Sequence, residues 1–317
     1  MISSVVDVNA ESFLKGGGRL PIDVNRTLLV VGYGSLLSGY GMLARRRGGG
    51  SKLVARDAFP VSLHNARRGL AKPSSHGEYL AMDLEPVDPN QPIVAEPAAG
   101  DEAGIGALGL EFGREWAERL ARREEYDPAK FLQLLEFADR ARTPLGEFLL
   151  SIAERTRFDL LAYRCALREM LNYTSHGYIF HPVPFRDGRV AIAAIASGFD
   201  GSGDPELPSK RREFGMNRLL ALDEALRITT FALDHEGQTG YFVECILGAV
   251  HGLAVADLLQ GLHQAEELGL DVARRVADLL PLEQELFLQA TSLDRARYQQ
   301  VFPEQPLRMQ ALLASQG

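Results

Sequence analysis

A glycine-containing turn follows the first strongly apolar segment of the chain and is the clearest place where the sequence could do chemistry. Residues 27–31 are apolar or β-branched and predict a buried strand. The strand runs directly into Gly32, Tyr33, Gly34 and Ser35. Glycine lets another group approach the main chain closely, and successive N–H groups in such a turn can converge on an anion. The turn therefore predicts a site for a carboxylate or a developing oxyanion.

Other interpretations of this turn compete with an anion site. A dinucleotide fingerprint needs a third glycine where the sequence has Leu37, and an acidic residue about 20 residues further on, where it has Lys52 to Arg56. The nucleophile elbow of hydrolases needs glycines two positions before and after the serine, but Tyr33 and Leu37 stand there. A tight turn in which Ser35 has no chemical role stays open on the turn alone.

A second candidate lies near the end of an expected helix over roughly residues 112–126. Glu124 follows Leu120 by one helical turn, so it continues the apolar stripe of that helix. Glu125 is rotated by about 100° and is expected to point elsewhere. A carboxylate on a buried stripe costs free energy unless it is paired or used. Glu124 therefore either pairs with one of the two arginines that precede it or acts as an acid–base group.

Taken together, the two motifs resemble those of the γ-glutamylcyclotransferase superfamily. Its members carry a Tyr-Gly-Ser-Asn or Tyr-Gly-Ser-Leu turn after the first strand, and further on a catalytic glutamate in a segment such as Leu-Asp-x-x-Glu-Gly-Tyr. The matching positions are Tyr33, Gly34, Ser35, Leu36 and Glu124. The resemblance covers about residues 27–198, with an insertion near 127–175. A histidine–arginine stretch at 64–68 is somewhat closer to the glutathione-specific branch.

The chain also departs from the family pattern. Glu125 stands where a small residue is usual, and Ala121 stands where an aspartate is usual. The helical region beyond residue 205 has no counterpart in the minimal family. These departures bear on the substrate more than on the fold.

The resemblance implies cyclising cleavage of a γ-glutamyl amide, the work of a cyclotransferase or lyase. The free α-amine attacks its own γ-carbonyl, 5-oxoproline forms, and an amine or amino acid leaves. The folded-back substrate supplies proximity, so a base and then an acid are needed but no nucleophile from the protein. Glu124 takes both roles in this hypothesis, and burial is expected to raise its pKa above about 4.3. Substrate binding falls to Tyr33, Gly34, Ser35 and Leu36, and the N–H groups of residues 34–36 are expected to hold the carboxylate or oxyanion.

The resemblance implies no metal and no cofactor, and it leaves the amine half of the substrate open. Glutathione, a γ-glutamyl amino acid or another γ-glutamyl metabolite would present the same half. His176 and His181 lie in a stretch that is not expected to be helical, which argues against a metal site there. The alternative is a non-catalytic binding or scaffold protein of the same fold. In that case a helical C-terminal region would mediate oligomerisation, and a homo-oligomer through these helices is left open in either case.

Composition limits the other classes of protein to which the chain could belong. The 317 residues are 46% hydrophobic and 24% charged, which suits a globular chain with a sizeable core. A net charge of −8 argues against nucleic-acid and anionic-membrane partners. Cys165 and Cys245 give neither a disulfide framework nor a zinc spacing. Because no signal peptide or membrane span is evident either, we expect a cytoplasmic protein that acts on a small molecule.

The order of elements predicts an α+β fold, a small mixed or antiparallel β-barrel of the γ-glutamylcyclotransferase type. Strands are expected at 27–31, 53–63 with a break or kink near Pro60, 80–84 and 105–110, and in a hairpin over 183–195. A long surface loop is expected over 86–104, and helices over 112–126, over 129–172 in two or three pieces with a start at Thr143-Pro144, and over most of 217–313. The expected organisation is an arm at 1–26, a domain at 27–203 with a helical insertion at 127–175, and a helical C-terminal region at 204–317.

Overall fold

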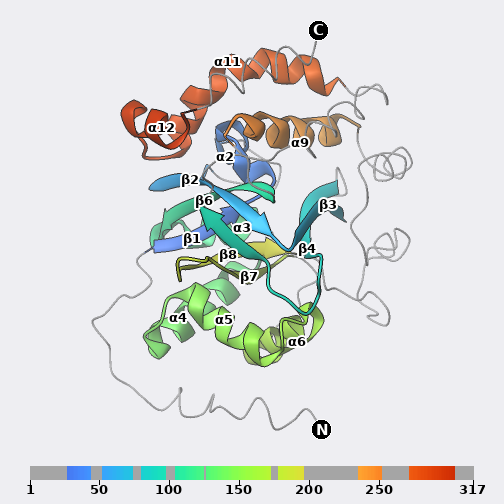
Figure 1. Ribbon diagram of the computed structural model, residues 1–317, viewed down its shortest axis with the longest axis vertical. Coiled ribbons are helices and arrows are strands. Elements are labelled where there is room, and N and C mark those ends of the chain that lie inside the picture. The colour runs from blue at the N-terminus through green and yellow to red at the C-terminus, as the bar shows by residue number, and fades with distance from the viewer. Residues whose placement is uncertain are drawn as a thin grey trace.

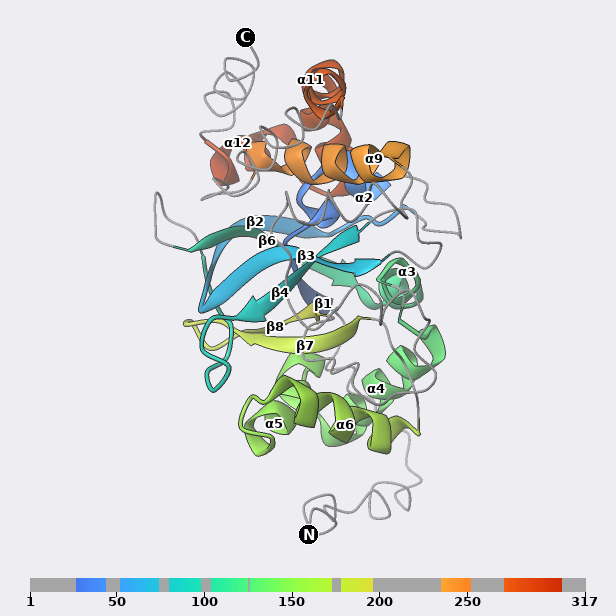
Figure 2. The same cartoon turned by 90° about the vertical axis from the view of Figure 1, so that its right-hand side faces the viewer.

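The protein is described by a computed structural model for residues 27–43, 52–73, 80–97, 104–124, 126–172, 178–195, 235–251 and 271–303. Within these ranges it is a mixed α+β structure built on one curled sheet (Figure 1). Helices from the middle of the chain cover one side of the sheet, and helices from the C-terminal region lie on the opposite side (Figure 2). The mixed α+β class is confirmed, while the family type of the fold stays a prediction.

Six strands form the curled sheet. In spatial order they are β5 Val94–Pro97, β2 Asp57–His64, β6 Ile105–Gly113, β1 Thr27–Gly32, β8 Val190–Ile195 and β7 Ile179–Pro184. β1 and β8 run parallel, and the other neighbours are antiparallel. The strands β3 Ala66–Pro73 and β4 Leu80–Pro86 form a separate antiparallel pair.

The two edges of the sheet meet at one point. Ala95 in β5 forms a bridge with Phe185, directly after β7, and the N–H of Arg186 donates to the carbonyl of Ala95 at 3.1 Å. A sheet whose first and last strands touch has curled part of the way to a barrel. The sheet is therefore a partly closed barrel, and only this general part of the expected small barrel is confirmed.

The expected strand over 53–63 and the expected loop over 86–104 were wrong in their bounds. The strand expected over 53–63 begins at Asp57 and runs unbroken through Pro60. Proline is tolerated there because it pairs only with Leu108 of β6, and the described part of β5 reaches β2 no earlier than Val61. The surface loop expected over 86–104 contains β5, in which Ala95 is fully buried.

The helix expected over 112–126 begins later than its apolar pattern suggests. β6 continues to Gly113, a 3-10 turn spans Arg114–Trp116, and α3 spans Ala117–Arg123. Phe112 is buried as a strand residue, and its apolar character was taken for part of the helix face.

The insertion forms a layer of three helices, as expected. They are α4 Pro128–Ala141, α5 Leu145–Arg155 and α6 Leu160–Leu171. Asp127 and Asp159 cap the first and third by accepting hydrogen bonds from N–H groups of the first turn. The start of α5 differs from the prediction, because Pro144 rather than Thr143 is its N-cap.

The C-terminal region packs on the same chain, beside the glycine turn. Its described elements are α9 His235–Leu247, the 3-10 turn η3 Gly248–Val250, α11 Val272–Ala290 and α12 Arg295–Val301. Of these, α9, η3 and α11 lie against the short helix α2 Gly39–Leu43 or the 3-10 turn η1 Ser35–Leu37; Figure 2 shows α9 and α11 beside α2. A methyl group on Gly39 would lie 2.1 Å from the backbone nitrogen of Phe287, so this contact is backbone against backbone. The domain boundary expected near residue 203 lies outside the described residues.

Candidate functional site

The glycine turn, residues 32–36, sits where β1 ends and η1 begins. A methyl group on Gly32 would lie 2.8 Å from the Cβ of Leu36, so glycine is needed for the chain to fold back on itself here. The guanidinium of Arg68 in β3 donates to the carbonyl of Tyr33 at 2.8 Å and to that of Gly106 at 3.1 Å. The hydroxyl of Tyr33 donates to the carbonyl of Ala194 in β8. The turn is thus held from three strands.

Several backbone donors of the turn have no acceptor among the described residues. The N–H of Leu37 donates to the carbonyl of Gly34 at 2.9 Å and closes η1. Among the described residues, the N–H groups of Gly34, Ser35 and Leu36 donate to no acceptor. The first N–H groups of a helical turn have no partner within the turn, so this arrangement follows from the local geometry. It is the donor set that the sequence predicts for a carboxylate or oxyanion.

Glu124 lies at the C-cap of α3, and the helical phase predicted for it holds. Its N–H donates to the carbonyl of Leu120 at 3.0 Å, and Leu120 is fully buried. The Glu124 side chain is 17% exposed, and one carboxylate oxygen lies 3.9 Å from Nε of Arg123. The sequence left open whether Glu124 pairs with a neighbouring arginine. The pair with Arg123 exists, but its distance is at the outer limit for an ion pair. Glu125 lies outside the described residues.

Arg123 connects the end of α3 to the glycine turn. Its side chain is fully buried, and one terminal nitrogen donates to Oγ of Ser35 at 3.2 Å and to the carbonyl of Gly41 at 2.6 Å. A guanidinium cannot accept a proton. The contact gives Ser35 a donor rather than a base, which argues against a serine nucleophile. Sequence reasoning considered Arg123 only as a partner of Glu124.

Two buried tyrosine hydroxyls near the turn have raised pKa values. Burial raises the pKa of the Tyr33 hydroxyl well above its usual value, and the negative charges of Asp83 and Glu124 raise it further. The pKa of the Tyr178 hydroxyl is raised by the same causes, burial first. Both phenols therefore stay protonated at neutral pH. The contact between Arg123 and Ser35 is the geometric observation that brings the end of α3 beside the glycine turn.

Three residues near the turn were missed from the sequence. Asp83 in β4 is fully buried and accepts a hydrogen bond from the N–H of Leu84 at 2.9 Å. The hydroxyl of Tyr178 donates to the carbonyl of Met82, and the hydroxyl of Tyr241 in α9 accepts from the N–H of Met82 at 2.8 Å. The side chains of Tyr178 and Tyr241 thus satisfy both backbone groups of Met82. A local signal existed only for Asp83, as the one charged residue within the alternating apolar segment Leu80 to Leu84.

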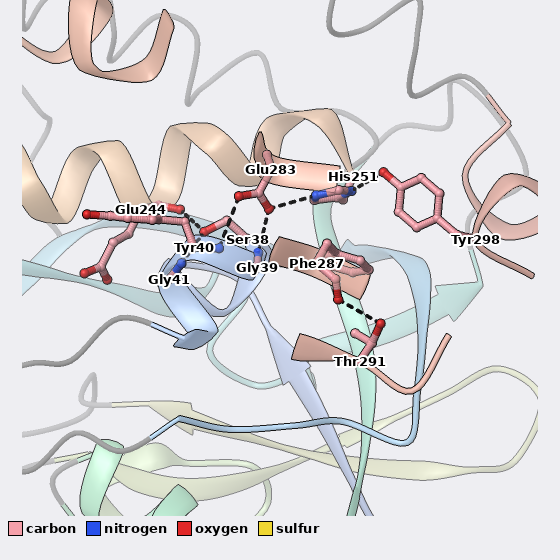
Figure 3. Close-up of polar contacts among 10 residues, drawn as sticks. All are labelled: Ser38, Gly39, Tyr40, Gly41, Glu244, His251, Glu283, Phe287, Thr291 and Tyr298. Atoms are coloured by element: carbon pink, nitrogen blue, oxygen red, sulfur yellow. Dashed lines mark hydrogen bonds and ion pairs between the residues drawn. The ribbon is translucent and has the colours of Figure 1, made fainter. Parts of the chain in front are cut away.

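A second buried polar cluster lies behind the turn, at the start of α2 (Figure 3). The fully buried carboxylate of Glu283 in α11 accepts from the N–H of Gly39 at 2.5 Å and from that of Tyr40 at 3.1 Å. Nε2 of His251 lies 3.0 Å from the same carboxylate, and Nδ1 lies 3.2 Å from the Tyr298 hydroxyl. An imidazole with its proton on Nε2 satisfies both contacts.

This cluster holds elements together, and within the part of the chain that the structure describes no nucleophile contacts its histidine. Oγ of Ser38 donates to the carbonyl of Glu244 at 2.6 Å, not to His251 (Figure 3). Glu283 acts as a helix-capping carboxylate that α11 supplies to α2. The cluster therefore fastens the C-terminal region to the segment that follows the glycine turn.

No family model, curated protein or solved structure matches the chain. Among the described residues, no set of histidine, cysteine, aspartate or glutamate side chains is arranged to hold a metal ion. His176 of the histidine pair lies outside those residues. No described helix is both long and apolar enough to cross a membrane.

Proposed function

We propose that the protein cleaves γ-glutamyl amides by attack of the substrate's own α-amine, releasing 5-oxoproline and an amine or amino acid. One observation carries the proposal. Arg123 and Ser35, 88 residues apart in sequence, are in hydrogen-bond contact, and Glu124 follows Arg123 directly. The carboxylate expected to be the base and the turn expected to bind the substrate are therefore neighbours.

The charges around the turn match the two ends of a γ-glutamyl head group. The α-carboxylate of such a substrate needs hydrogen-bond donors, which the N–H groups of residues 34–36 would supply. Its α-ammonium needs a negative charge, which Glu124 would supply, with the buried charge of Asp83 nearby. Held at both ends in this way, the substrate would keep its α-amine against its γ-carbonyl, which makes the reaction intramolecular.

The chemical steps need one proton relay. Glu124 takes a proton from the α-ammonium, and the freed nitrogen forms a bond to the γ-carbon. The carbonyl oxygen becomes an oxyanion, which backbone N–H groups stabilise. The bond from the γ-carbon to the amide nitrogen then breaks, and Glu124 passes protons from the attacking nitrogen to the leaving one. The products are 5-oxoproline and the free amine.

The test is a screen of γ-glutamyl compounds in which 5-oxoproline is measured by mass spectrometry. With a turned-over substrate, Glu124→Gln should lose at least about 10²-fold in rate, because the amide keeps the shape but cannot accept a proton. Glu118→Gln is the matched control: Glu118 lies on the same helix, its side chain is 57% exposed, and its ion pair with Arg122 is on the surface. The control should keep full activity.

Two outcomes would contradict the proposal in different ways. A fully active Glu124→Gln variant would show that Glu124 is not the base. No turnover of any γ-glutamyl compound by the wild type would favour the non-catalytic binding or scaffold protein. The observation that favours a binding or scaffold protein is that the C-terminal region covers the turn closely. Tyr33 and Ser35 are only 7% and 8% exposed.

A further inference from the structure

Arg123 contacts both parts of the candidate site through different nitrogens of one guanidinium. Its Nε lies 3.9 Å from a carboxylate oxygen of Glu124, and a terminal nitrogen donates to Oγ of Ser35 at 3.2 Å and to the carbonyl of Gly41 at 2.6 Å. A guanidinium is planar, and its nitrogens have fixed positions relative to one another. One rigid group therefore connects the expected base, the glycine turn and α2.

The surroundings of this guanidinium keep it in place. A methyl group on Gly41 would lie 2.0 Å from the carbonyl oxygen of Ser35, so α2 packs directly on the glycine turn. The two acceptors of the terminal nitrogen are thus fixed relative to each other. The Arg123 side chain is fully buried, and that of Glu124 is 17% exposed. The attraction between their charges is therefore screened less than that of a pair on the surface.

Tyrosines from other elements also interact with Glu124. Burial first, and then negative charges that include Glu124, raise the pKa of the Tyr33 and Tyr178 hydroxyls, so both phenols stay neutral at neutral pH. Asp83 of β4 and Tyr241 of α9 act on the same two hydroxyls. Arg123 is the cation in this set of side chains. A cation beside a carboxylate favours the charged form of that carboxylate.

We propose that Arg123 is a positioning residue of the proposed reaction, which fixes the Glu124 carboxylate relative to the glycine turn and supplies the positive charge beside it. The proposal rests on the proposed function, in which Glu124 is the base. A carboxylate must be ionised to take a proton from the substrate. The guanidinium therefore extends activity to lower pH, and its contacts hold the base and the turn at one separation. Arg123 itself transfers no proton.

The test is the pH dependence of kcat/KM for a γ-glutamyl compound that the wild type turns over. The acid limb of this profile reports the base of the free enzyme. In Arg123→Gln the charge is lost, so the limb should move up by at least about 0.7 pH units, the effect of a unit charge about 4 Å away even in bulk water. The plateau of kcat/KM should also fall at least about tenfold, because the base is no longer held beside the turn.

Arg123→Lys separates the charge from the positioning. An ammonium has a single nitrogen, which cannot take the places of both Nε and the terminal nitrogen. Its charge should keep the acid limb within about 0.3 pH units of wild type, while the plateau of kcat/KM falls at least about tenfold. If Arg123→Gln does not fold, this variant decides the question. Full activity of Arg123→Lys would overturn the inference.

Arg122→Gln is the matched control. Arg122 also lies 3.9 Å from a glutamate, Glu118, but these two side chains are 60% and 57% exposed. Neither the limb nor the plateau should change in this variant. A limb that stays in place in folded Arg123→Gln, with an active wild type, would give Arg123 a purely structural role. It would overturn the inference and leave the proposed function standing. A wild type inactive on every γ-glutamyl compound would overturn both.

Discussion

Replacement of Glu283 by glutamine tests how the C-terminal region is attached to the glycine turn. The carboxylate is fully buried and serves three donors: the N–H groups of Gly39 and Tyr40 and Nε2 of His251 (Figure 3). A glutamine amide has one acceptor oxygen and one donor nitrogen. With its oxygen toward Gly39 and His251, its nitrogen must face the N–H of Tyr40. One donor is left without an acceptor, and the other two lose a charged acceptor.

The cost follows from these lost contacts. An unsatisfied buried donor costs about 1–3 kcal/mol, and a hydrogen bond to a charged group is worth more than one to a neutral group. We therefore expect Glu283→Gln to lower the free energy of unfolding by about 2–4 kcal/mol. At about 2–4 °C per kcal/mol for a large domain, the Tm should fall by at least about 4 °C.

Urea unfolding and differential scanning calorimetry measure the effect. Glu285→Gln is the matched control, because Glu285 lies on the same helix, its side chain is 52% exposed, and it pairs with Arg295 at the surface. That variant should stay within about 0.5 kcal/mol of wild type. A Glu283→Gln protein as stable as the control would refute the reasoning. The capping contacts would then contribute little to the attachment of α11.

Three further outcomes are expected. Gly34→Val should abolish 5-oxoproline formation, because the valine side chain would press on the Tyr241 hydroxyl and on Met82. Steady-state assays of the soluble variant check this. Ser35→Ala should lose less activity than Glu124→Gln. Burial and the nearby guanidinium of Arg164 lower the pKa of His181 well below 6.5. As pH falls below about 6.5 the unfolded chain therefore binds a proton that the folded chain does not, and stability falls by up to about 1.4 kcal/mol per pH unit. Urea midpoints at pH 7 and pH 5.5 should differ less in His181→Phe than in wild type. Truncation after residue 203 should give poorly soluble protein, because it uncovers the buried side chains of η1 and α2. A fragment that is monodisperse in gel filtration and fully active would contradict this expectation.

The parts of the fold that were predicted have strong local signals. β1 and its turn are visible because an apolar run ends abruptly in glycine, and the hairpin of β7 and β8 is visible around Asp187-Gly188, where Gly188 has a φ of 93°. Helices were predicted over 129–172 in two or three pieces; the caps of α4 and α6, Asp127 and Asp159, were not predicted, although each caps the residues that directly follow it. In each case the residues that decide the structure are adjacent in sequence.

The parts that were missed depend on contacts between distant segments. Phe112 suits a buried helix face and a buried strand equally well, so its pattern alone could not place the end of β6. β5 is short and lies in a proline-rich stretch, and its pairing with β2 is what makes it a strand. Tyr178 and Tyr241 bind Met82 across 96 and 159 positions, and no local pattern encodes such a partner.

The relation between the glycine turn and the C-terminal region is the main difference between sequence and structure. From the sequence the region past residue 204 is expected to be helical and to bury one face, but its leucine spacing does not say which surface buries that face. The structure shows which surface buries it. Gly39 and Gly248 allow backbone-close contact, Glu283 caps α2, and Tyr241 stands against Gly34. Glycines that look like loop residues in the sequence are packing positions for the other half of the chain. Any activity at the turn would therefore depend on residues from both regions, and a resemblance limited to residues 27–198 describes only part of the site.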